Sequence, residues 1–87
     1  MPTVYVPPLL RDLTGGDDVL EVEGQNVREA IERLDARFPG LRDRLCRGNQ
    51  LAPGLSVTVD GRVSSLGLIQ KLEPTSEVHF LPAIGGG

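Results

Sequence analysis

The chain has 87 residues, of which 39% are hydrophobic and 24% are charged, a composition typical of one small globular domain. Nine Lys and Arg against twelve Asp and Glu give a net charge of −3, and the only aromatic residues are one Tyr and two Phe. A protein that binds DNA or RNA needs a basic surface and aromatic side chains for stacking, so the composition argues against nucleic-acid binding.

Membrane, metal and enzyme functions are also disfavoured. No run approaches the ~20 apolar residues that span a bilayer, and no basic leader precedes the first strand, so we expect a soluble cytoplasmic protein with no membrane partner. Cys46 is the only cysteine and His79 the only histidine, which excludes an internal disulfide and a four-ligand zinc site. No nucleophile motif lies near His79, which we interpret as a strand surface residue. We therefore expect neither a metal site nor an autonomous enzyme.

Two alternating segments open the chain and predict a pair of antiparallel strands. Residues 3–6 alternate polar and apolar until Pro7-Pro8, and residues 18–23 alternate again after a loose loop that closes with Thr14-Gly15-Gly16. The residues expected to face inward are Val4, Val6, Leu20 and Val22.

The apolar period then changes to that of a helix. Asn26 followed by Glu29 resembles a capping box, and Pro39-Gly40 ends the segment. One face carries the apolar residues Val27, Ala30, Ile31, Leu34 and Phe38.

The second half predicts a hairpin and a last strand. Asp60-Gly61 is a strong two-residue turn signal, and residues 77–81 alternate with Val78 and Phe80 inward. Between these elements we expect another helical turn at 41–47 that covers Cys46, a loop at 48–54, strands at 55–59 and 62–63, and a short helical or irregular segment at 66–72.

This order predicts an α+β roll of the β-grasp type, a mixed sheet with one main helix on one face and the last strand beside the first. On this phasing Leu81 points outward, beside Tyr5 and Thr58. We expect residues 1–81 to form the domain and residues 82–87 to form a flexible tail, because three terminal glycines cost much conformational entropy to order.

Several segments together resemble the ubiquitin-like sulfur carriers of the MoaD/ThiS family. The first loop, Pro8-Leu9-Leu10-Arg11 followed by Thr14-Gly15-Gly16, resembles that of the cysteine-biosynthetic and general MoaD-like branch of that family. The other matching segments are Leu34-Asp35-Ala36-Arg37-Phe38-Pro39-Gly40-Leu41, Val57-Thr58-Val59-Asp60-Gly61, and Glu77-Val78-His79-Phe80-Leu81-Pro82-Ala83-Ile84 leading into Gly86-Gly87.

The resemblance implies that Gly87 is the reactive residue. An E1-like adenylyltransferase would use ATP and magnesium to convert the Gly87 carboxylate to an acyl adenylate, which a sulfur nucleophile displaces to give a thiocarboxylate. The carrier itself would bind no cofactor. Contact with partner enzymes would fall on Leu81, Pro82, Ala83, Ile84, Gly85 and Gly86.

The sequence leaves the sulfur acceptor open. A cysteine-synthase-like enzyme is the first choice, ahead of the large subunit of molybdopterin synthase, for which this chain would be the small subunit, and of a specialised thio-transfer enzyme. Two other functions stay possible on the same fold: a ubiquitin-like modifier that forms isopeptide bonds through Gly87, and an interaction module with an inert tail.

Overall fold

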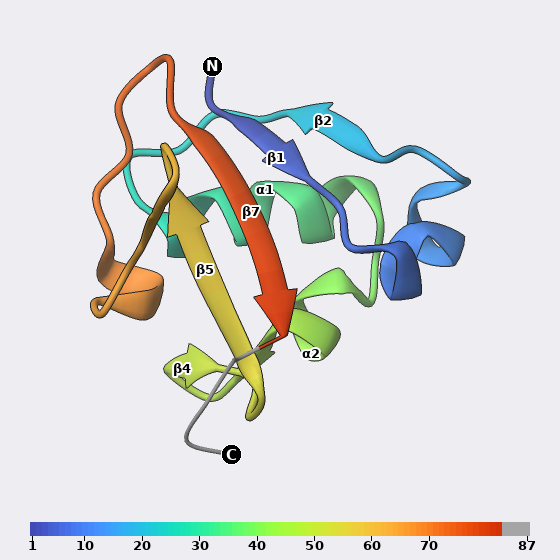
Figure 1. The fold of residues 1–87 in the computed structure, drawn as a ribbon. Helices are drawn as coiled ribbons and strands as arrows, with labels where there is room; N and C mark the ends of the chain where they lie inside the picture. Colours follow the sequence, from blue (N-terminus) through green and yellow to red (C-terminus); the bar gives the residue numbers. More distant parts are fainter. Residues whose placement is uncertain (83–87) are drawn as a thin grey trace.

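The computed structural model describes residues 1–82 and has two layers, a five-stranded sheet and a layer of helices (Figure 1). The elements are β1 (Thr3–Tyr5), η1 (Pro8–Thr14), β2 (Val19–Glu21), α1 (Val27–Arg37), α2 (Leu41–Leu45), β3 (Cys46–Arg47), β4 (Gln50–Leu51), β5 (Leu55–Val59), β6 (Arg62–Val63), η2 (Gly67–Ile69) and β7 (Glu77–Pro82). In residues 1–82 the structure has no helix with the length and hydrophobicity needed to cross a membrane.

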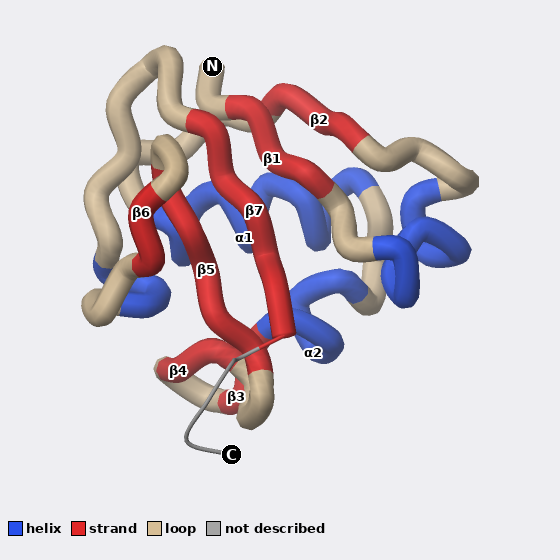
Figure 2. Tube along the Cα trace, in the orientation of Figure 1, coloured by secondary structure: helices blue, strands red, loops and turns tan. Residues whose placement is uncertain are grey.

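The strand order is β2-β1-β7-β5-β6, with β7 in the middle (Figure 2). Strand β7 runs parallel to β1, with Thr3 opposite Glu77, and antiparallel to β5, with Val57 opposite Phe80. Strands β1 and β2 form the expected antiparallel pair. The predicted β-grasp roll is therefore confirmed.

The core lies between the sheet and α1. It contains the inward residues predicted from the alternation of the strands and from the apolar period of the helix. Val4 and Val78 on the sheet are 1% and 0% exposed, and Ile31 and Leu34 on α1 are each 1% exposed. Phe38, expected as the last core residue of the helix, is half-buried and packs against the edge of this core. Burial of one helix stripe against one sheet face is the main source of stability for a domain of this size.

The start of α1 has a modified capping box. The side-chain oxygen of Asn26 accepts a hydrogen bond from the backbone N–H of Glu29 at 2.9 Å. The Glu29 carboxylate accepts from the N–H of Gln25, also at 2.9 Å, one residue before the cap. Gly24 is required here, because a Cβ would lie 2.8 Å from the backbone nitrogen of Ala30.

Asp60 fixes the hairpin and also the start of β7. Asp60 and Gly61 have φ values of 54° and 83°, and they join β5 to β6 as a two-residue turn with both central residues left-handed. The Asp60 carboxylate accepts from the N–H of Glu77 at 2.8 Å, and the Asp60 N–H donates to the Glu77 carbonyl at 2.9 Å. One side chain therefore ties the turn to the central strand.

Two segments differ from the sequence prediction. The expected loose loop after β1 is a 3₁₀ helix, η1, in which the hydroxyl of Thr14 donates to the carbonyl of Asp17 at 2.6 Å. The expected helical turn at 41–47 ends at Leu45, because Cys46 begins the two-residue strand β3, which pairs with β4 inside the predicted 48–54 loop.

Candidate functional site

The site predicted from the sequence begins where the central strand ends. Strand β7 extends to Pro82, one residue beyond the predicted end at Leu81, and Pro82 lies opposite Leu55 of β5. The hydroxyl of Ser56 donates to the carbonyl of Leu81 at 3.4 Å. The root of the predicted tail is thus part of a paired strand. The remaining predicted site residues, Ala83, Ile84, Gly85, Gly86 and Gly87, lie outside the described residues.

A small apolar groove lies beside this root, and we call it the tail groove. Its volume is about 270 Å³. Leu9 from η1 is 84% exposed here, and the exposed side chain of Arg44 from α2 supplies the charged group. The tail groove is lined by Pro7, Leu9, Leu10, Arg44, Gly54, Leu55, Phe80 and Pro82. The groove was not predicted from the sequence, because its lining residues come from elements that are distant along the chain.

On the outer face of the sheet, the neighbours of Leu81 differ from those expected. His79, and not Leu81, lies between Tyr5 and Thr58, and Leu81 lies opposite Ser56. The cause is the register of β7, which pairs Tyr5 and Thr58 with His79, and β1 ends at Tyr5, so no residue of β1 lies beside Leu81. Leu81 does point outward as predicted, and it is 40% exposed.

His79 packs as a surface residue of the sheet. Its ring stacks on that of Tyr5 with centroids 4.1 Å apart and planes 3° from parallel. Thr58, on the other side of His79, is only 8% exposed. These contacts agree with the interpretation of His79 as a strand surface residue, and they place a flat aromatic patch next to Leu81 on the outer face.

Cys46 is the first residue of strand β3. It is half-buried against the core, and this burial raises the pKa of its thiol, with the charges of Arg42 and Arg28 acting in the opposite direction. A thiol with a raised pKa and limited access is a poor sulfur nucleophile.

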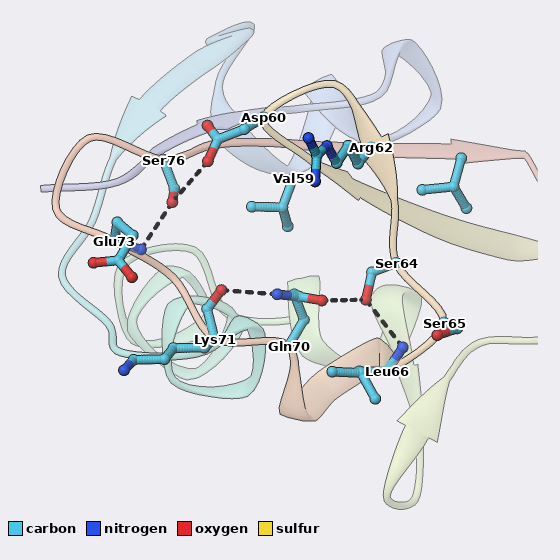
Figure 3. Close-up of a pocket in the computed structure, with 11 residues that line it drawn as sticks. Val59, Asp60, Arg62, Ser64, Ser65, Leu66, Gln70, Lys71, Glu73 and Ser76 are labelled. Atoms are coloured by element: carbon cyan, nitrogen blue, oxygen red, sulfur yellow. Dashed lines mark hydrogen bonds between the residues drawn. The ribbon is translucent and has the colours of Figure 1, made fainter.

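A larger cavity, about 600 Å³, lies between the β5–β6 turn and the segment before β7 (Figure 3). Four of its polar side chains bond to one another in pairs: the hydroxyl of Ser64 donates to the Gln70 side chain at 2.7 Å, and the hydroxyl of Ser76 donates to Asp60 at 3.2 Å. Because these side chains already have partners, we interpret the cavity as a structural feature of the loop.

Comparison with known proteins identifies the family. The family model described as "ThiS family" matches residues 4–87. The chain belongs to the ThiS family. The sulfur carrier protein CysO of Mycobacterium tuberculosis is 31% identical, over 98% of this chain and 97% of the relative.

Two solved structures have the same fold along the whole carrier. A chain in the crystal structure of the Amycolatopsis orientalis BexX/CysO complex aligns with a TM-score of 0.90 and 30% identity, covering all of both chains. Mycobacterium tuberculosis CysO aligns with a TM-score of 0.87 and 27% identity, over 97% of this chain and all of the other. The protein is therefore a CysO-like sulfur carrier, a co-substrate of other enzymes and not itself an enzyme.

Proposed function

We propose that the carboxylate of Gly87 is adenylated by an E1-like enzyme, converted to a thiocarboxylate, and used to donate sulfur for cysteine or a related sulfur-containing metabolite. The observation that carries this proposal is the 31% identity to CysO along 98% of the chain, together with the glycine-only end of a tail that starts at the central strand.

Activation is required by the chemistry of the carboxylate. A terminal carboxyl group has a pKa of about 3.3–3.7, so it is ionised at neutral pH and has no good leaving group. Adenylation with ATP and magnesium, both held by the partner, releases pyrophosphate and installs AMP as the leaving group. Sulfide then forms the C–S bond as the C–O bond to AMP breaks, which gives the thiocarboxylate directly. A persulfide would give an acyl disulfide, from which a thiol releases the thiocarboxylate by reducing the S–S bond. We expect this reaction in the cytoplasm, because the activating enzyme consumes ATP.

Glycine is suited to this role because the partner must enclose the reacting atom. Backbone without side chains can enter a channel in which a Cβ would clash, and six residues from Pro82 onward reach at most about 20 Å. This distance is measured from Pro82, which is held in place by its pairing with Leu55 of β5.

We propose that partner enzymes recognise the surface around the paired end of β7. Leu81 and the tail groove place exposed apolar side chains on both sides of β7, and Leu9 in the groove is 84% exposed. Exposed apolar groups that cluster beside a reactive segment are typical of a protein contact. We propose that the activating enzyme and the sulfur acceptor both dock here, with Ala83 to Gly86 completing the contact.

The acceptor can be tested with a thiocarboxylate made directly from the full chain. A C-terminal thioester, prepared by thiolysis of an intein fusion, is converted with sulfide to the thiocarboxylate and mixed with a cysteine-synthase-like enzyme and its activated amino-acid substrate. We expect the thiocarboxylate sulfur to bond to the amino-acid substrate, which gives a cysteine joined to the Gly87 carbonyl, seen as a mass gain of the chain. Hydrolysis of this acyl bond then releases free cysteine and the original carboxylate. Consumption only by the large subunit of molybdopterin synthase, with no cysteine formed by the first enzyme, would contradict the assignment.

A further inference from the structure

The turn between β5 and β6 contains the only place in the sequence where an Asp or an Asn precedes a Gly. This dipeptide is Asp60-Gly61. Such a pair is chemically labile, because glycine has no side chain to keep its backbone nitrogen away from the carboxyl carbon of the preceding residue. Both residues are exposed, so water can take part in a reaction here. The turn is therefore a candidate site for modification of the backbone.

Asp60 also has an unusual backbone conformation. With a φ of 54°, it is the one residue other than glycine in the left-handed region among residues 1–82. This region is disfavoured for residues with a side chain, and Asp is tolerated in it because its short carboxylate forms hydrogen bonds to nearby groups. The conformation of Asp60 therefore depends on its hydrogen bonds.

Three hydrogen bonds connect Asp60 to the segment that leads into β7. One carboxylate oxygen accepts from the N–H of Glu77 at 2.8 Å, and the other accepts from the hydroxyl of Ser76 at 3.2 Å. The N–H of Asp60 donates to the carbonyl of Glu77 at 2.9 Å. We call the two bonds to the carboxylate oxygens the Asp60 clamp.

Ser76 is itself held in place. It is 1% exposed, its N–H donates to the carbonyl of Glu73 at 3.0 Å, and its hydroxyl accepts from the N–H of Glu73 at 2.8 Å (Figure 3). The clamp therefore binds both oxygens of Asp60 to a fixed part of the structure. A reaction that removes one of these oxygens must first break a clamp bond.

We propose that Asp60 is a site of backbone modification, at which an isoaspartyl residue forms when the Asp60 clamp opens, and that the clamp keeps this reaction slow in the folded protein. The backbone nitrogen of Gly61 attacks the carboxyl carbon of Asp60. A C–N bond forms and a C–O bond breaks, and the oxygen leaves as water with the amide proton and one proton from solvent. The product is a cyclic imide.

Water then opens the imide at one of its two carbonyl carbons. Attack at the side-chain carbonyl regenerates the Asp60-Gly61 linkage. Attack at the main-chain carbonyl breaks the original peptide bond, so the chain now runs through the side chain of residue 60. This isoaspartyl product has the same mass as the starting protein, and its formation needs no reactant other than water.

The modification would weaken the start of the central strand. An isoaspartyl linkage adds one methylene carbon to the main chain between Val59 and Arg62, which are paired across the two-residue turn. The N–H of Glu77 would also lose the side-chain carboxylate that accepts its hydrogen bond. Because β7 is the middle strand of the sheet, the clamp protects the element on which the fold depends most.

The test follows isoaspartate formation in the full chain during storage at neutral pH, at a temperature at which circular dichroism shows each variant folded. Chromatography of the tryptic peptide that contains Asp60, and methylation by an isoaspartyl methyltransferase, measure the product. We expect Ser76→Ala, which removes one clamp bond, to form isoaspartate at least about threefold faster than the parent. The parent unfolded in guanidinium chloride should react at least about tenfold faster than the folded parent.

Ser64→Ala is the matched control, because Ser64 lines the same cavity and its hydroxyl also donates one bond and accepts another. It donates to Gln70 at 2.7 Å and accepts from the N–H of Leu66 at 3.0 Å, and neither bond involves Asp60. We expect Ser64→Ala to react like the parent.

The proposal is overturned if folded Ser76→Ala reacts no faster than the parent, or if Ser64→Ala is accelerated as much. Equal rates in the folded and the unfolded parent would also overturn it, and this comparison does not depend on the folding of either variant. Since no step involves Gly87, each of these results leaves the proposed function to be decided by its own experiment.

Discussion

Cys46 is the one thiol of a protein whose proposed role is to carry sulfur, but its surroundings make it a poor nucleophile. Burial raises its pKa, and in β3 it is half-buried against the core. We expect Cys46→Ser to fold and to accept sulfur at Gly87 nearly as well as the wild type, measured by intact mass after activation. A serine variant that is adenylated but not sulfurated would show that the carrier uses its own thiol.

Leu81 is an exposed apolar residue near the end of β7, with 40% of its surface accessible. We expect Leu81→Asp to lower kcat/KM for adenylation by at least about tenfold, because a charge would be buried in the partner contact. The fold should be unchanged, since the side chain contributes little to the core.

Ile69→Asp is the control for this variant. Ile69 is 68% exposed on η2, away from the end of β7, and we expect its substitution to leave adenylation unchanged. Equal losses from the two variants, or no loss from Leu81→Asp, would remove Leu81 from the partner surface.

At the scale of elements, helix α1 carries the largest share of the packing against the sheet. Leu34 is 1% exposed near the centre of its buried face. We expect Leu34→Ala to lower the free energy of unfolding by about 2–5 kcal/mol, because it removes buried methyl groups and leaves a cavity. Urea unfolding measures this loss, and Leu9→Ala at an exposed position should cost under about 0.5 kcal/mol. A loss below about 1 kcal/mol for Leu34→Ala would contradict the proposed phasing of the helix.

The elements that could be predicted are those with a local signal. Alternation fixed the inward residues of β1, β2 and β7, and Asn26 and Asp60-Gly61 marked a cap and a turn that the structure confirms. The strands β3 and β4 have two residues each, too few to show a period, and they form because the chain after α2 returns to pair with itself. The helix η1 also lacks a periodic signal in the sequence, and it is stabilised by the hydrogen bond of Thr14 and by the burial of Leu10.

The neighbours of Leu81 on adjacent strands depend on the register between strands, which alternation within one strand does not reveal. The alternation of β7 correctly placed Leu81 outward, but its expected contact with Tyr5 was wrong, because the register pairs Tyr5 with His79. The tail groove brings together η1, α2, β5 and β7, which are distant in the sequence, so no local pattern could reveal it. The predicted reactive residue itself, Gly87, lies outside the described residues and stays a prediction.

For the whole molecule, the proposed function requires the carbonyl of Gly87 to reach one fixed position in a partner. We expect the addition of a single alanine after Gly87, or the replacement of Gly86 by leucine, to stop adenylation and leave the fold intact. An added residue displaces the reactive carbon by about 3.5 Å, which tight positioning does not tolerate. Pyrophosphate release measures the reaction, and an unextended chain is the control. Normal release from the extended chain, with no trimming seen by mass, would contradict this requirement.

The central claim, that this protein carries sulfur on its C-terminal carboxylate, is tested most directly by intact mass. The chain is incubated with an E1-like activating enzyme, ATP, magnesium and sulfide, beside a chain that lacks Gly86 and Gly87. We predict that the full chain gains the mass difference between one sulfur and one oxygen and that the truncated chain gains nothing. An unchanged mass despite pyrophosphate release, or a ladder of larger conjugates in place of the single shift, would contradict the account.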